Sequence, residues 1–248
     1  MSSQTVPYRA IFASRQEALN TMLDDTSNYM MVDSFKGAPV NMRVFESFNP
    51  FHVWPSPSIP VPGQPKRLAR SVESVWQGVK LVDGITDFNQ FLGQPSKRPD
   101  DHERRQLKDY CYADSLFVYG DRLLDLLSAR FLIYLPTYLF ILEKLVPEAL
   151  LRELNQHLTS VGPVLFYDWD ANQNITDTSC SFSHSALLAS WFNGTFENDY
   201  WTLAHRVLQE NDWLTFDASI KNLLNRYYAI HNGFQDASRR QGSKSLGT

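Results

Sequence analysis

Residues 70–80 read Arg-Ser-Val-Glu-Ser-Val-Trp-Gln-Gly-Val-Lys. Ser71 suits the N-cap of a helix, because its hydroxyl can accept from the unpaired N–H groups of the first turn. One apolar helix face is predicted by four residues at helical spacing: Val72, Val75, Trp76 and Val79. A polar stripe lies about a right angle away, since each residue turns a helix by roughly 100°: Glu73, Gln77 and Lys80. The stretch predicts a helix over residues 71–82, although such a polar stripe alone is most often a solvated face.

The composition is that of a folded, weakly acidic protein. Of 248 residues, 43% are apolar and 20% are charged, and the net charge is −4. This apolar supply is enough for a substantial core, so the chain does not have the composition of a disordered protein. The negative charge argues against binding of polyanions by the chain as a whole, while local basic patches remain compatible with it. Cys111 and Cys180 form neither a disulfide framework nor the spacing of a metal site.

The N-terminus and the longest apolar run argue against secretion and against a membrane partner. Residues 1–7 show no basic segment followed by an apolar one, so no secretion signal is predicted and we expect a cytoplasmic protein. The longest apolar run, residues 131–142, is too short to span a bilayer and carries Pro136 in its middle. We expect a buried core helix that is kinked or broken at Pro136.

Two loops beside the central helix carry residues suited to ligand binding. Residues 50–70 are rich in proline and cannot form a regular helix. Phe51 and Trp54 in this loop predict an aromatic wall of a pocket, whereas the alternative is an ordinary covered surface loop. A later polar loop carries Lys97 and Arg98, which indicate either a phosphate site or a solvated basic surface. Three basic residues follow this pair: Arg104, Arg105 and Lys108.

A second polar cluster follows a short apolar run at residues 162–167, which predicts a buried strand. The strand leads into Asp168 and a loop that ends at Asn172. Acids and amides at a strand end are a frequent place for chemistry, although Asp and Asn also simply make turns. Ser183 opens a further helix with His184 in its first turn, where a lone histidine is more often structural than catalytic.

No metal ion or cofactor is predicted. The six histidines are scattered without the spacing of metal ligands. The sequence also has no Gly-rich phosphate loop, no Gly-x-Ser-x-Gly elbow and no His-Glu-x-x-His motif. Any chemistry is therefore expected to come from side chains alone.

The remaining patterns favour helices over strands. A strand at residues 8–12 is followed by a capping box at Ser14 and Glu17, which opens a helix to about residue 24. Further helices are predicted at residues 121–145, 147–159, 183–191, 200–211 and 218–231. We expect a mainly α-helical, multihelical single domain with a few short strands over residues 1–237, and a disordered tail at residues 238–248.

The order of these motifs resembles the NADAR, or YbiA-like, family of N-glycosidases, of which the chain reads as a divergent member. That family places an extended aromatic segment, like residues 45–51, before a helix of pattern Val-Glu-x-x-aromatic-Gln-x-x-Lys, like residues 72–80. A Lys-Arg-rich loop similar to residues 97–99 follows, and then a helix ending in Ala-basic-Phe, like residues 129–131. A later strand leads into a loop of Asp and Asn, as residues 164–172 do. The resemblance covers roughly residues 44–191 in separated pieces.

The sequence departs from the family pattern at three places. Ser74 stands where the family often has histidine. The Trp-Gly pair that often ends the family's strand-end loop is absent after Asp168, and the helix at residues 147–159 is additional. These departures bear on the substrate more than on the fold.

The resemblance implies a YbiA-like fold and an enzyme that hydrolyses an N-glycosidic bond in a nucleotide, a ribose phosphate or an ADP-ribosyl compound. As the base departs, positive charge develops on the sugar, and a fixed carboxylate can stabilise it and activate the attacking water. Glu73 is the first catalytic candidate and Asp168 the second. The candidates for substrate binding are Phe51, Trp54, Trp76, Gln77, Lys80, Lys97, Arg98, Asn172 and His184.

Alternatives stay open for single residues and for the protein. Trp54 or Trp76 would stack on the base, although Trp76 lies on the apolar face and suits the core equally well. Lys80 and the pair at residues 97–98 would bind phosphate. The chain could instead be a non-catalytic sensor of ADP-ribose or a nucleotide, or a helical interaction protein. Nucleic acid is expected only as a modified substrate, and the sequence leaves the oligomeric state open.

Overall fold

A three-stranded parallel sheet joins two strands near the N-terminus to a strand much later in the chain. The computed structural model describes residues 8–23, 28–35, 37–82, 84–98 and 112–210. The strand order is β1-β7-β2, with β1 at Ala10–Ser14, β7 at Val164–Asp168 and β2 at Met30–Asp33. The central strand β7 pairs in parallel with both neighbours, and Val164 lies opposite both Ala10 and Met30.

Helices cover both faces of this sheet. Successive side chains of a strand point to opposite faces, so β7 contributes to two apolar clusters. Val164 and Phe166 belong to the main core, on the face contacted by α6 (Glu148–Ser160) and α7 (His184–Phe192). Leu165 and Tyr167 pack on the other face, under α1 (Arg15–Leu23).

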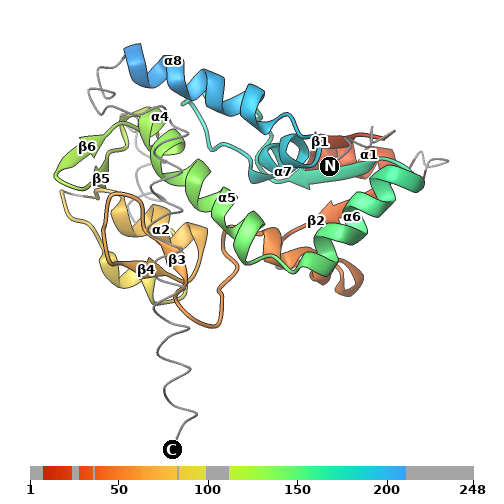
Figure 1. The fold of residues 1–248 in the computed structure, drawn as a ribbon, viewed down its shortest axis with the longest axis horizontal. Helices are drawn as coiled ribbons and strands as arrows, with labels where there is room; N and C mark the ends of the chain where they lie inside the picture. The colour runs from red at the N-terminus through yellow and green to blue at the C-terminus, as the bar shows by residue number, and fades with distance from the viewer. Residues whose placement is uncertain (1–7, 24–27, 36, 83, 99–111, 211–248) are drawn as a thin grey trace, which may run out of the picture.

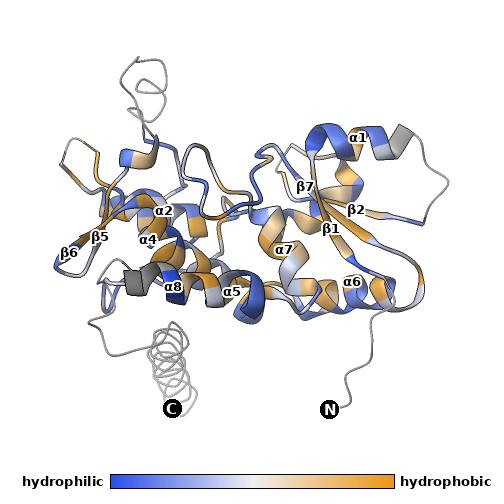
Figure 2. Ribbon diagram, turned by 90° about the horizontal axis from the view of Figure 1, so that it is seen from above, coloured by the Kyte–Doolittle hydropathy of each residue, from blue (hydrophilic) through white to orange (hydrophobic). Residues whose placement is uncertain are grey.

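Most of the remaining elements form a second half of the molecule, with α5 between the halves (Figures 1 and 2). Its hairpins are β3 (Ile59–Pro60) with β4 (Leu68–Ala69), and β5 (Phe117–Tyr119) with β6 (Arg122–Leu124). The α-helices are α2 (Val72–Val79), α4 (Leu126–Ala129), α5 (Leu135–Lys144) and α8 (Thr202–Glu210). Short 3-10 segments are η1 (Val40–Phe48), η2 (Phe88–Phe91) and η3 (Tyr112–Asp114), and π-helical turns are η4 (Arg130–Tyr134) and η5 (Glu197–Trp201). The segment η1 instead contacts β2 of the sheet.

The expectation of a mainly α-helical, YbiA-like fold is wrong. The described chain is a mixed α/β structure organised around the parallel sheet. Its strands are four or five residues long, and such short runs carry little periodic signal. Their pairing depends on contacts between segments that are far apart in the sequence, which no local pattern records. The predicted helix at residues 218–231 and the tail at residues 238–248 lie outside the described residues.

The helix α2 forms where its sequence predicts, with Ser71 as N-cap. The Ser71 hydroxyl accepts from the Ser74 N–H at 2.9 Å, which confirms the predicted cap. The helix ends at Val79, three residues earlier than expected, and Lys80 adopts an extended conformation that bridges to Phe117. All of α2 is buried, and a Cβ at Gly78 would clash with the Phe91 ring, so glycine permits this close packing.

The long apolar helix runs through Pro136 by way of a π-helical turn. The ring of a helical proline clashes with the carbonyl four residues earlier, here that of Leu132, which lies within η4 immediately before α5. Residues 126–144 are long and apolar enough to cross a membrane by length and composition, but 78% of their apolar window is buried inside the protein. This run is therefore the core helix of the molecule. It binds η1 directly, because the Tyr138 hydroxyl donates to the Phe48 carbonyl at 2.6 Å.

Candidate functional site

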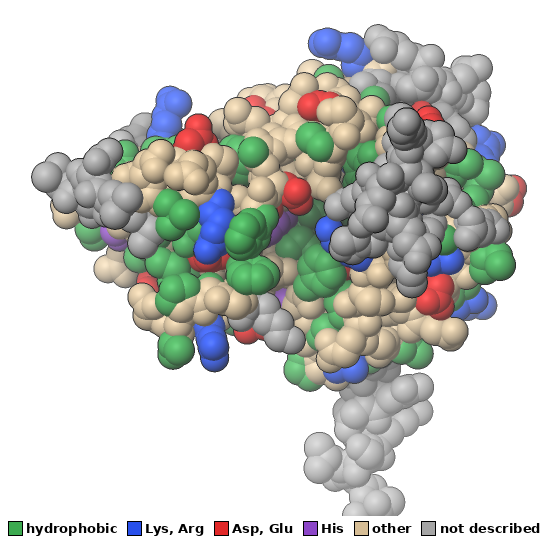
Figure 3. All heavy atoms as spheres, turned by 180° about the vertical axis from the view of Figure 1, so that it is seen from behind, with side chains coloured by type: hydrophobic (Ala, Val, Ile, Leu, Met, Phe, Trp, Pro, Cys, Tyr) green, Lys and Arg blue, Asp and Glu red, His purple; other side chains and the backbone are tan. Residues whose placement is uncertain are grey.

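A cleft of about 670 Å³ lies between the two halves, next to the carboxyl end of β7. Open α/β sheets commonly bind ligands outside the carboxyl ends of their strands. Residues from α2, η4, the strand-end loop after β7 and the first turn of α7 line it. Figure 3 shows a hollow on this face of the molecule, where hydrophobic, acidic and histidine side chains gather.

Glu73 lies in the first turn of α2 and lines this cleft. Its side chain is 7% exposed, and its backbone N–H donates to the Pro50 carbonyl at 2.9 Å. The Gln77 amide, one turn later, donates to Glu73 Oε1 at 2.7 Å. The first turn of a helix also favours a negative charge, because its N–H groups carry partial positive charge. The polar stripe of α2 is thus not a solvated face: it is buried and borders the cleft.

Asp168 ends β7 and is held by three hydrogen bonds. Its carboxylate accepts from His184 Nδ1 at 2.7 Å, from the Ser183 hydroxyl at 2.9 Å and from the Trp169 N–H at 2.7 Å. Burial by itself would raise the pKa of Asp168. The positive charge and hydrogen bond of the His184 ring, and then the hydrogen bonds of Ser183 and Trp169, outweigh burial and lower that pKa to about 2. Asp168 is therefore ionised throughout the neutral range.

Lys80 and Lys97 line the cleft and bring positive charge to it. Lys80 is buried and Lys97 is exposed. The Arg130 guanidinium also lines the cleft, but it donates to the carbonyls of three loop residues: Ile175, Asp177 and Cys180. Arg130 therefore shapes the strand-end loop, whereas the two lysines contribute positive charge at the wall of the cleft.

Aromatic rings line the cleft at two depths. Trp76 is buried and packs on Phe117, with ring centroids 4.1 Å apart, so it is a core residue with an edge on the cleft. Trp169, Phe35 and Phe51 line the cleft and are exposed, Trp169 to 63%. The Arg15 guanidinium lies 4.3 Å from the centre of the Trp169 ring and supports it from β1's end of the sheet.

Three of the predicted site residues do not line the cleft. Trp54 contacts His52 and exchanges backbone and side-chain hydrogen bonds with Arg70 in the proline-rich loop. Arg98 donates to the carbonyls of Lys80 and Ile85, and the Asn172 amide donates to the carbonyl of Asp177. The predicted roles of these three in substrate binding are therefore not supported, since their polar groups serve the loops.

The other predicted residues meet in the cleft, with additions that the sequence analysis missed. The predicted residues that line it are Phe51, Glu73, Trp76, Gln77, Lys80, Lys97, Asp168 and His184. The added lining residues are Phe35, Asn49, Pro50, Tyr112, Arg130, Tyr134, Trp169, Asp170, Ser181 and Phe182. Trp169 directly follows a predicted residue and could have been found, whereas Phe35 had no local signal.

Burial, with the nearby charges of Tyr138 and of the acids in the cleft, raises the pKa of Tyr134 far above its usual value.

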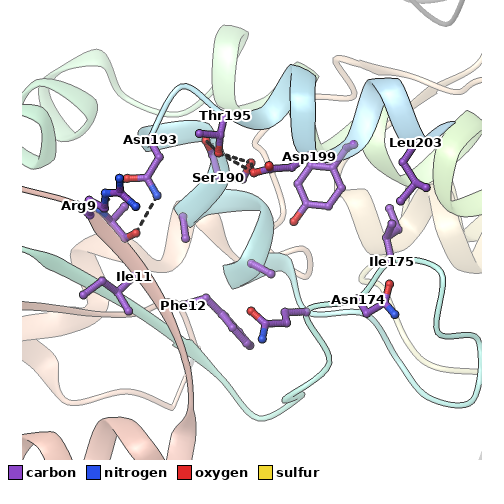
Figure 4. A pocket seen from close by; sticks show the side chains of 15 residues that line it. Arg9, Ile11, Phe12, Asn174, Ile175, Ser190, Asn193, Thr195, Asp199 and Leu203 are labelled. Carbon is purple, nitrogen blue, oxygen red and sulfur yellow. Dashed lines mark hydrogen bonds between the residues drawn. The ribbon is translucent and has the colours of Figure 1, made fainter. Parts of the chain in front are cut away.

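A second cavity, of about 630 Å³, lies between β1, α7 and the start of α8 (Figure 4). Its carboxylate, that of Asp199, accepts from the hydroxyls of Ser190 and Thr195 at 2.6 Å each. The Asn193 amide binds both the N–H and the C=O of Ala10, which protects the open edge of β1. These polar groups support the fold around the cavity, so the cleft that holds Glu73 and Asp168 is the stronger candidate.

Within the described residues, no group of three or more His, Cys, Asp or Glu side chains could hold a metal ion.

Comparisons with known proteins give one match. The model of a Family of unknown function (DUF6939) matches residues 14–188, which is most of the chain. A comparison with curated proteins found no match, and neither did a comparison with solved structures. The resemblance to the NADAR enzymes stays a prediction. The chain belongs to the family of unknown function DUF6939.

Proposed function

We propose that the protein is a hydrolase that cleaves the N-glycosidic bond of a nucleotide, a ribose phosphate or an ADP-ribosyl compound. The observation that carries the proposal is that Glu73 and Asp168 line one cavity together with two lysines and exposed aromatic rings. Each feature matches one part of such a substrate: the carboxylates suit the sugar, the lysines a phosphate and the rings a flat base. A volume of about 670 Å³ lies within the usual range for small-molecule sites.

The two carboxylates have different roles in this reaction: both stabilise positive charge on the sugar, and Glu73 also acts as the base. As the bond between C1′ and nitrogen breaks, its electron pair leaves with the base, and positive charge develops on the sugar. The negative charges of Glu73 and Asp168 stabilise that charge in a partly enclosed site. A water molecule then adds to C1′ and gives one proton to Glu73. Glu73 passes this proton to the base where the base leaves as an anion, and to solvent where the base leaves neutral, so the carboxylate is restored. Asp168 is the poorer base, because a carboxylate with a pKa of about 2 has little affinity for a proton at neutral pH.

The test is release of base by the wild-type protein and by Glu73→Gln. The variant keeps the size of the side chain and removes the charge. Glu143→Gln is the matched control, because Glu143 is an exposed residue of α5 outside the cleft. The substrates are AMP, nicotinamide mononucleotide, their dephosphorylated nucleosides and an ADP-ribosylated peptide, and released base is measured by chromatography.

We expect wild type and Glu143→Gln to release base from at least one phosphorylated compound. Glu73→Gln should be slower by about a hundred- to a thousandfold, the usual effect of removing one preorganised group at a reacting centre. Equal rates in Glu73→Gln and wild type would contradict the role of Glu73. Binding of these compounds by all three proteins without any turnover would instead support the sensor alternative.

A further inference from the structure

We infer that His184 and Ser34 are positioning residues, which hold the Asp168 carboxylate in one orientation at the cleft wall. For its kinetic consequences this inference rests on the proposed function. Its structural part does not, because it concerns hydrogen bonds and a titration that can be observed without any substrate.

The three residues form a continuous hydrogen-bonded relay. The Ser34 hydroxyl lies 2.6 Å from His184 Nε2, and His184 Nδ1 lies 2.7 Å from Asp168 Oδ2. Ser34 follows β2, Asp168 ends β7 and His184 begins α7. Because β2 and β7 are neighbouring parallel strands, their carboxyl ends lie at the same edge of the sheet, and α7 packs on β7 beside them.

The acceptor at one end determines the proton positions in the relay. An ionised Asp168 can only accept, so Nδ1 of His184 carries the proton. In the neutral ring, Nε2 is then an acceptor and takes the hydroxyl proton of Ser34. Both ring nitrogens are thus engaged, and the predicted contact of His184 with the substrate would break one of these bonds. Its alternative assignment, as a structural histidine, fits the geometry better.

Burial holds the relay in place. Ser34 is 2% and His184 8% exposed. The Asn49 amide donates to the Ser34 carbonyl at 2.9 Å, which fixes the backbone that carries the hydroxyl. The other titratable groups that act on this region are Tyr134 and Tyr138 on the core helix, Glu73 on α2 and Asp170 in the strand-end loop.

The order Ser-His-Asp also matches the relay of serine hydrolases, in which the serine is the nucleophile. Two observations argue against that role. Among the described residues, those that line the cleft include Phe35 and His184 but not Ser34. The N–H of Phe35 already donates to Asp33 Oδ1 at 2.9 Å, so it is not aimed at a developing oxyanion. Ser34 therefore acts on His184.

The kinetic test compares His184→Ala with His184→Asn. The amide of asparagine can donate from nearly the place of Nδ1, whereas alanine leaves Asp168 without this partner. Loss of an orienting partner of this kind commonly costs about 10–100-fold in activity. We expect His184→Ala to lose kcat by that amount, with a smaller change in KM, and His184→Asn to recover most of it. The acid limb of the pH profile should move to higher pH in His184→Ala.

The substrate-free test is a titration of the Asp168 carboxyl carbon by NMR. We expect the midpoint to stay low in wild type and to rise in His184→Ala. In His184→Asn it should rise by a smaller amount, because asparagine keeps a hydrogen-bond donor but not the positive charge of the ring. Ser34→Ala should keep the proton on Nδ1 but shift the Nε2 signal in the nitrogen spectrum, because Nε2 loses its hydrogen-bond donor. The control Ser47→Ala, also at a buried serine, should leave both ring-nitrogen signals unchanged. An unchanged midpoint in His184→Ala would overturn the inference even if the enzyme is inactive. Covalent labelling of Ser34 by a fluorophosphonate would also overturn it, because Ser34 would then be a nucleophile.

Discussion

The Gln77 amide donates to the Glu73 carboxylate at 2.7 Å, one turn apart on a helix that is buried along its whole length. Residues four apart on a helix face each other, so the pair follows directly from the sequence spacing. What the spacing does not state is that both side chains are withdrawn from solvent. A buried carboxylate needs such a donor, because the loss of hydration is otherwise uncompensated.

Removing this donor should therefore destabilise the protein. In Gln77→Leu the volume is similar, but the Glu73 carboxylate loses the bond. We expect a loss of about 1.5–3 kcal/mol in the free energy of unfolding, the usual contribution of a hydrogen bond to a charged group. Urea unfolding of wild type and Gln77→Leu at neutral pH measures this difference in the free energy of unfolding. The control is Gln16→Leu on the exposed side of α1, for which we expect a change within about 0.5 kcal/mol.

The lysines of the cleft should discriminate substrates by their phosphate. In Lys97→Met, KM for a phosphorylated substrate should rise about tenfold or more, because hydrogen bonds to charged groups contribute roughly 1.5–3 kcal/mol. KM for the dephosphorylated nucleoside should stay the same. Lys80→Met should show the same difference with some loss of stability, since Lys80 is buried. Lys144→Met, on α5 outside the cleft, serves as the control. Equal rises in KM for the phosphorylated and the dephosphorylated substrate would count against a phosphate contact.

Trp169 should contribute to binding and little to stability. Its ring is 63% exposed and borders the cleft. Stacking of a base on an aromatic side chain is typically worth about 1–3 kcal/mol, so Trp169→Ala should weaken binding of a nucleotide by about 5–150-fold. We expect no such loss for ribose 5-phosphate, which has no base, when both are measured by calorimetry. Leu92→Ala removes another exposed apolar side chain away from the cleft and should change neither affinity. An equal loss of affinity for the nucleotide and for ribose 5-phosphate would show that Trp169 does not contact the base.

Asp168 should make stability depend on pH in the acid range. Its pKa falls from 3.8 to about 2 on folding, so the folded protein favours the ionised form. This stabilisation is fully present above the unfolded pKa and is lost as pH falls from about 4 through about 2. Linkage gives a contribution of about 2 kcal/mol. We expect Asp168→Asn to unfold with a weaker pH dependence over this interval than wild type in denaturant titrations. Identical slopes for the two proteins would show that Asp168 does not carry the effect.

Local features could be read from the sequence because neighbouring residues determine them. The cap at Ser71 and the capping box of Ser14 and Glu17 both form as predicted. The pair of Glu73 and Gln77 also follows from a spacing of four. In each case the interacting groups lie within one helical turn, so their geometry hardly depends on the rest of the chain. The end of α2 was less predictable, since the pairing of Lys80 with Phe117 stops the helix early.

Only the tertiary structure decided the fold class and which residues line the cleft. Strands β1 and β7 pair although about 150 residues separate them, and that pairing turns an expected helical fold into a mixed one. The same sheet brings Ser34 to His184 and Asp168. Contacts within the loops hold Trp54, Arg98 and Asn172 outside the cleft. The physical reason is that these contacts gain their energy from burial and hydrogen bonds between distant segments. A sequence pattern records which residues can be buried, but not which distant residue they will meet.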